Sequence, residues 1–122
     1  MAIPPTVVIV VDDNPGFLKS VIRLLTVHGF ATRAFGSAEA LLESDGARGA
    51  TCLLLDIHLG GMSGIELQHR LAASGARYPI IFMTAIDDDA IRKEAIDGGC
   101  LAYLRKPFAP HLLLEAIAKA VA

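Results

Sequence analysis

The sequence has little cysteine, and the cysteines it has do not form a recognisable pair. Cys52 and Cys100 stand far apart in the chain, and no C-x-x-C motif occurs. Isolated cysteines of this kind are typical of small apolar side chains in the core of a protein from a reducing compartment. We therefore expect both to be buried, and we expect the protein to be cytoplasmic.

Long hydrophobic runs and an excess of basic charge are also missing. The first apolar run, VVIVV at residues 7–11, has only five residues and follows no basic segment, so neither a signal peptide nor a membrane span is expected. The formal net charge is −2, whereas a domain that binds nucleic acid by itself is normally basic. We therefore expect no membrane association and no direct nucleic acid contact by this domain.

Apolar runs that do not alternate with polar residues predict a buried parallel sheet. The strong runs are VVIVV (7–11), CLLL (52–55) and IIFM (80–83), and weaker strand candidates are ATRAF (31–35) and LAYLR (101–105). Strands of a parallel sheet are covered by helices on both faces, so their side chains are apolar on both sides. The weaker runs are expected to complete the same sheet.

Segments of helical period lie between these strands. In the first, an apolar stripe ends at Gly29, and its members are Phe17, Val21, Leu24, Leu25 and His28. Later helices are expected to start near Ser37, Gly64, Asp87 and Pro110. Strand and helix alternate five times without a linker, so we predict one domain over residues 1–122. Its expected fold is α/β, a flavodoxin-like doubly wound (βα)5 domain with strand order 2-1-3-4-5.

Three carboxylates follow the ends of two neighbouring strands of that sheet. Asp12 and Asp13 follow the first strand, and Asp56 follows the third. With the expected order these ends meet at the topological switch point, where open parallel sheets bind ligands. Two unit charges about 4 Å apart repel by about 4 kcal/mol at an effective dielectric of about 20, so protons or a cation must neutralise them. An all-oxygen cluster suits Mg²⁺, although Asp13 alone could instead help to cap the following helix.

The remaining strand ends add a hydroxyl and an ammonium group. Thr84 ends the fourth strand, and Lys106 follows the fifth. Taken singly, a threonine or a lysine at a strand end means little. Together with the acids, they provide the groups needed to transfer a phosphoryl group onto an aspartate, because a metal and a lysine neutralise the phosphoryl oxygens.

The motifs VVIVVDD, LLLDIHLGGMSG, IIFMTA and YLRKPF resemble the receiver domain of two-component response regulators, over essentially the whole chain. HGFATRAFGSAEALL, MSGIEL and KPF look most like its FixJ-type branch. The resemblance implies that Asp56 is the phosphoacceptor and that Lys106 and Thr84 hold the phosphoryl oxygens. It implies Mg²⁺, or Mn²⁺ in its place, bound directly by Asp13, Asp56 and the backbone carbonyl of His58, with Asp12 acting mainly through a metal-bound water.

The resemblance also implies how the signal enters and leaves. A sensor histidine kinase would supply the phosphoryl group, and Thr84 and Tyr103 would act together as the switch. Expected outcomes are a phosphorylation-dependent homodimer and control of transcription by a C-terminal DNA-binding output domain beyond Ala122. The Lys106–Pro107 bond is expected to be cis. The chain departs from the family at Gly60–Gly61, where receivers commonly have a proline, and this puts the rigidity of that loop in doubt.

Three other functions compete with this interpretation. The chain could be a stand-alone single-domain regulator. It could also be an enzyme, an aspartate-dependent phosphohydrolase, but such folds use a D-x-D motif and a cap domain, and here the acids are adjacent and no cap is present. A flavodoxin-type cofactor binder would need a hydroxyl- and glycine-rich loop where VDDNPG stands. We therefore expect a signalling phosphoacceptor and not an enzyme that turns over a substrate.

Overall fold

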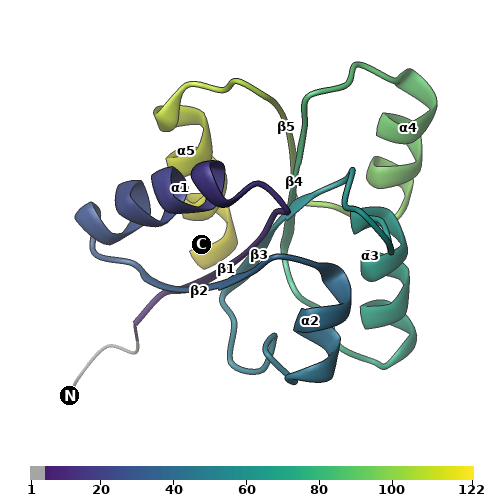
Figure 1. Ribbon diagram of the computed structural model, residues 1–122, viewed down its shortest axis with the longest axis horizontal. Helices are drawn as coiled ribbons and strands as arrows, with labels where there is room; N and C mark the ends of the chain where they lie inside the picture. Colours follow the sequence, from purple (N-terminus) through teal and green to yellow (C-terminus); the bar gives the residue numbers. More distant parts are fainter. Residues whose placement is uncertain (1–4) are drawn as a thin grey trace.

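The computed structural model describes residues 5–122, in which five strands and five helices alternate (Figure 1). The strands are β1 (Val7–Val11), β2 (Ala31–Phe35), β3 (Cys52–Asp56), β4 (Ile80–Thr84) and β5 (Ala102–Arg105). The helices are α1 (Pro15–Val27), α2 (Ala38–Glu43), α3 (Gly64–Ala73), α4 (Asp89–Asp97) and α5 (Pro110–Val121). All strands are parallel, in the order β2-β1-β3-β4-β5. The predicted flavodoxin-like, doubly wound fold is therefore confirmed.

The apolar strands of the sheet are buried because helices cover both of its faces. Alternate residues of a strand point to opposite faces. Val8 and Val10 of β1 belong to a core cluster with residues of α1 and α5, whereas Ile9 and Val11 belong to a second cluster with residues of α2 and α3. Figure 1 shows α1 and α5 on one side of the sheet and the other three helices on the opposite side.

Polar side chains at the first turns explain where most helices begin. Ser37, Ser63 and Asp88 each accept a hydrogen bond from the main-chain N–H three residues later. Asn14 does the same for α1, so Asn14 and not Asp13 caps that helix. The start near Asp87 was predicted one residue early, because Asp88 is the residue whose carboxylate reaches the N–H of Ile91 at 3.1 Å.

The sheet register aligns the ends of the central strands. Val11 pairs with Leu55, so Asp12 and Asp56, the residues that follow them, stand at the same level. Thr84 pairs with Arg105, which places Lys106 directly beyond the end of β4. The acids, the hydroxyl and the ammonium are thereby brought to one edge of the sheet.

The expected burial is confirmed for Cys52 and met only in part by Cys100. Cys52 is fully buried in β3, and Cys100 is half-buried against the cluster beneath α3. Burial raises the pKa of the Cys52 thiol to about 11, so this group is an unreactive apolar side chain. Within residues 5–122, no helix has both the length and the apolar character needed to cross a bilayer.

Candidate functional site

The three predicted carboxylates form a cluster at the carboxyl ends of β1 and β3. One oxygen each from Asp12, Asp13 and Asp56 lies within 4.8 Å of the others. Asp12 is fully buried and Asp56 nearly so, whereas Asp13 is exposed. The cluster therefore has two acids set into the sheet edge and a third on its open side, an arrangement that leaves one face accessible.

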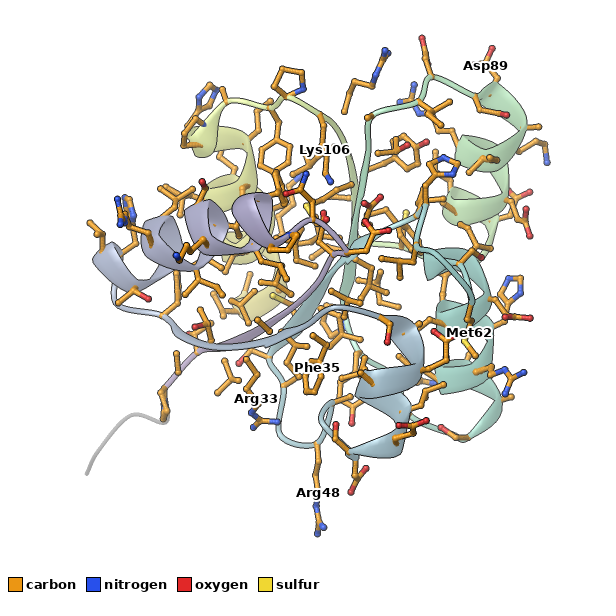
Figure 2. All side chains as sticks on the ribbon, viewed as in Figure 1. Arg33, Phe35, Arg48, Met62, Asp89 and Lys106 are labelled. Atoms are coloured by element: carbon orange, nitrogen blue, oxygen red, sulfur yellow. The ribbon has the colours of Figure 1, made fainter. Side chains whose placement is uncertain are left out.

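Lys106 lies within this cluster and binds its two buried members. Its Nζ donates to Oδ2 of Asp12 at 2.6 Å and to Oδ2 of Asp56 at 3.2 Å. The lysine side chain is only 16% exposed, so these ion pairs are shielded from solvent more than surface pairs are. In Figure 2, Lys106 extends from the segment after β5 toward the start of α1. The ammonium thus offsets part of the repulsion among the acids.

The environment of Asp56 works against its negative charge. Burial raises the pKa of this carboxyl group, and the charge of Asp12 raises it further. Lys106 and the main-chain N–H of His58, which donates to Oδ1 of Asp56 at 3.1 Å, oppose the rise. The net effect is a raised pKa, so an additional cation at the cluster would favour the ionised form.

Thr84 is at the expected strand end, but its hydroxyl is turned toward the following loop. The side chain is fully buried, and Oγ1 accepts from the N–H of Ile86 at 3.1 Å and contacts the Ile86 carbonyl at 3.2 Å. Tyr103, in β5, packs against the cluster that includes Phe82, and Arg92 lies over its ring at 5.8 Å. Among the described residues the buried Tyr103 hydroxyl has no hydrogen-bond partner.

The loop that follows Asp56 is anchored by a residue that the sequence did not suggest. Glu39, in α2, accepts a hydrogen bond from the N–H of Met62 at 3.0 Å. Met62 lies between α2 and α3 in Figure 2. No motif in the sequence indicates a contact between Glu39 and this loop. A side chain from another helix therefore holds the loop whose rigidity Gly60–Gly61 put in doubt.

A second residue was overlooked because it belonged to an ordinary apolar stripe. Phe17 was predicted to pack in the core with the rest of the α1 stripe, and it is half-buried against the α1/α5 cluster. Its ring, however, also lies beneath the Lys106 ammonium, with Nζ 4.0 Å from the ring centroid. The periodic pattern indicated a buried face, but it did not distinguish the residue nearest the acids.

Comparisons with known proteins show the family to which this chain belongs. Residues 8–118 match the model of the response regulator receiver domain. Nodulation protein W of Bradyrhizobium diazoefficiens is 37% identical over 114 residues, which cover 93% of this chain and 50% of that protein. Response regulator protein TmoT of Ectopseudomonas mendocina is 34% identical over 116 residues, which cover 95% of this chain and 53% of that protein. The chain thus spans about half the length of these curated relatives.

The fold comparison leads to the same group of proteins. The crystal structure of FixJ-N superposes with a TM-score of 0.87 at 33% identity, covering 97% of this chain and 94% of that one. The chain belongs to the response regulator receiver domain family. It is therefore a signalling domain related to transcriptional regulators of the FixJ type, as its motifs predicted.

Proposed function

We propose that this domain accepts a phosphoryl group on Asp56 from a phosphohistidine of a sensor histidine kinase in the cytoplasm. The observation that carries the proposal is the position of Asp56 within a cluster of two further carboxylates and one lysine. A lone buried aspartate would be a poor nucleophile because burial raises its pKa. The same aspartate beside cationic groups is suited to attack phosphorus, because those groups favour its ionised form and neutralise the incoming oxygens.

The donor set fits Mg²⁺, with Mn²⁺ as a substitute. Three carboxylates with oxygens within 4.8 Å of one another provide hard oxygen ligands, and the exposed position of Asp13 leaves room for water and phosphate. Asp12, Asp13, Asp56 and the backbone carbonyl of His58 would hold the ion. The N–H of His58 already binds Asp56, which keeps this part of the main chain beside the acids. When bound, the ion would supply charge neutralisation for the transferred group.

The transfer itself needs few protein groups. An oxygen of Asp56 forms a bond to phosphorus while the bond between phosphorus and the imidazole nitrogen breaks, and the electron pair of that bond stays on the imidazole. Lys106, which is already 3.2 Å from Asp56, stabilises the negative oxygens of the transferred group. Thr84 would bind another of these oxygens, for which its hydroxyl must leave the main-chain groups of Ile86.

The output of the domain would follow from that movement of Thr84. We propose that Tyr103 occupies the space that Thr84 vacates, and that the surface formed by α4, β5 and α5 then pairs with a second copy. One supporting observation is the buried Tyr103 hydroxyl, which has no hydrogen-bond partner among the described residues. The other is Arg92 of α4, which lies over the Tyr103 ring and so connects α4 with β5. Because the relatives are about twice as long, the proposed recipient of the signal is a C-terminal DNA-binding output domain that controls transcription.

Phosphoryl labelling tests the proposal directly. Incubation with acetyl phosphate and Mg²⁺ should add one phosphoryl group to the wild-type protein, measured as intact mass, and none to Asp56→Asn. Asp45→Asn is the matched control, because Asp45 is an exposed aspartate outside the acid cluster and should label normally. Equal labelling of wild type and Asp56→Asn would contradict the assignment. Continuous turnover of p-nitrophenyl phosphate would instead favour a phosphohydrolase.

A further inference from the structure

The Lys106 ammonium has a third contact, which is with an aromatic ring and not with a carboxylate. Besides Asp12 and Asp56, it lies over the face of the Phe17 ring, with Nζ 4.0 Å from the centroid. A cation within about 6 Å of an aromatic centroid is attracted by the electron-rich face of the ring. The contact is shielded, because the lysine is only 16% exposed and the phenylalanine is half-buried. Attraction of this kind is stronger where solvent is excluded.

Phe17 is held both at its ring and at its main chain. Phe108, which begins the segment after the Lys106–Pro107 bond, meets it edge to face, with centroids 6.2 Å apart and an interplanar angle of 79°. The main-chain N–H of Phe17 donates to the Asn14 side chain at 3.0 Å, in the first turn of α1. The ring is therefore half-buried and packed against a second aromatic ring, on a residue in the first turn of α1.

The three contacts of Lys106 respond differently to a metal ion. A divalent cation on the acid cluster draws on the same carboxylate oxygens that now hold the ammonium, and it also repels the ammonium. The ring face carries no net charge and is not a ligand that such an ion prefers. Phe17 is therefore the contact that persists when the carboxylates are occupied.

We infer that Phe17 is a positioning residue, whose ring face keeps the Lys106 ammonium directed at Asp56 while a metal ion occupies the carboxylates; this inference rests on the proposed phosphoryl transfer. Without the ring, the long lysine side chain can turn to solvent and the transferred oxygens lose their ammonium partner. The ring also covers one side of the ammonium from water, which strengthens its attraction for a phosphoryl oxygen.

Graded fluorination of the ring separates this electrostatic role from packing. Phe17 is replaced by 4-fluoro-, 3,5-difluoro- and 3,4,5-trifluorophenylalanine, which retain the shape of the ring but weaken the negative potential of its face. Phosphorylation by phosphoramidate with Mg²⁺ should slow stepwise along the series. The expected total fall is about 3- to 10-fold, from the usual strength of such contacts. A small donor is used because its reaction does not depend on the docking of a protein partner.

Two comparisons complete the test. The same substitutions at Phe30 should leave the rate unchanged, because this residue packs against the same core cluster but forms no cation–π contact with Lys106 among the described residues. Phe17→Tyr should retain the wild-type rate because it keeps the ring face, whereas Phe17→Leu should be as slow as the trifluoro variant. A rate that does not change with fluorination, or that falls equally at both positions, overturns the inference.

A second measurement tests the contact between Phe17 and Lys106 even if Asp56 accepts no phosphoryl group. A ring face shifts the resonances of groups above it upfield, so the side-chain Hε resonances of Lys106 should be upfield in the wild type and normal in Phe17→Leu. If Mg²⁺ leaves the upfield shift in place, the ring retains the lysine, as inferred. If Mg²⁺ abolishes it, the inference is wrong, whatever the labelling experiment shows.

Discussion

The carboxylate of Glu39, in α2, accepts a hydrogen bond at 3.0 Å from the main-chain N–H of Met62, in the loop that follows the predicted phosphoacceptor. This bond is the largest cause of the lowered pKa of Glu39. Gly61 makes the approach possible, because a Cβ at that position would lie 2.6 Å from Oε2 of Glu39. The loop between β3 and α3 is therefore held by α2, although two successive glycines leave its own backbone flexible.

Replacing Glu39 by alanine should destabilise the protein at neutral pH but not in acid. A carboxyl group with a lowered pKa in the folded state stabilises the fold above its unfolded pKa, and this contribution is lost as the pH falls through the folded value. The melting temperature of Glu39→Ala should therefore lie below that of the wild type at pH 7, and the gap should close below pH ~4. Thermal unfolding followed by circular dichroism across this pH range measures both quantities.

Glu43→Ala provides the control, because Glu43 is an exposed acid at the end of the same helix and makes no hydrogen bond to the loop among the described residues. A Glu39→Ala gap that stays constant from pH 7 to acid would show that the Met62 bond does not depend on the charge of the carboxylate.

The sequence predicted those parts of the site that depend on strand order and register. Four of the site residues follow or end an apolar run: Asp12, Asp56, Thr84 and Lys106. Parallel pairing of the strands brings such positions together, so the apolar pattern alone is enough to predict them. The contacts of Glu39 with Met62 and of Phe17 with Lys106 join distant helices and loops through ordinary side chains, so no local pattern indicates them. The Lys106–Pro107 bond is cis, as the resemblance implied. The direction of the Thr84 hydroxyl depends on a side-chain rotation, which sequence patterns do not specify.

Addition of Mg²⁺ should raise the melting temperature, because an ion that binds only the folded state stabilises it. At a concentration 100 times the dissociation constant the gain is about 2.7 kcal/mol. Asp13→Asn should weaken this response and should raise the melting temperature without metal. Asp13 is the appropriate acid to change because Lys106 binds the other two, so its charge has no ion-pair partner among the described residues.

Glu115→Gln is the matched control for that experiment, because it removes one exposed carboxylate of α5, outside the acid cluster. Both proteins are compared in chelator and in Mg²⁺ by calorimetry. A metal-free melting temperature of Asp13→Asn at or below that of the wild type would mean that repulsion within the cluster does not limit stability.

Asp56→Asn should raise the metal-free stability at neutral pH, and the gain should disappear in acid. Burial raises the folded pKa of Asp56 above its ordinary value, so the ionised form destabilises the folded state at neutral pH. This penalty is relieved as the pH falls through the folded pKa, where the wild type also becomes neutral at this position. Lys106 keeps Asp12 as a partner at 2.6 Å in the variant. Melting temperatures in chelator from pH 8 to pH 4 measure the gap, and a gap that widens toward acid would contradict the predicted sign.

Thr84→Ala should accept a phosphoryl group at Asp56 but should fail to switch the surface of α4, β5 and α5. The hydroxyl of Thr84 now binds main-chain groups of Ile86, and its transfer to a phosphoryl oxygen is the proposed link to Tyr103. Moving a two-state equilibrium from 1:99 to 99:1 needs about 5.5 kcal/mol of differential stabilisation. Charge-assisted contacts from Thr84, Lys106 and Mg²⁺, at roughly 1.5–3 kcal/mol each, could together supply this difference. Thr84→Ser keeps the hydroxyl and should switch like the wild type. Amide chemical shifts and sedimentation, recorded with and without beryllofluoride and Mg²⁺, compare the three proteins. Equal shifts of the α4 resonances in Thr84→Ala and in the wild type would exclude Thr84 as the coupling residue, because the surface would then respond to the acceptor without its hydroxyl.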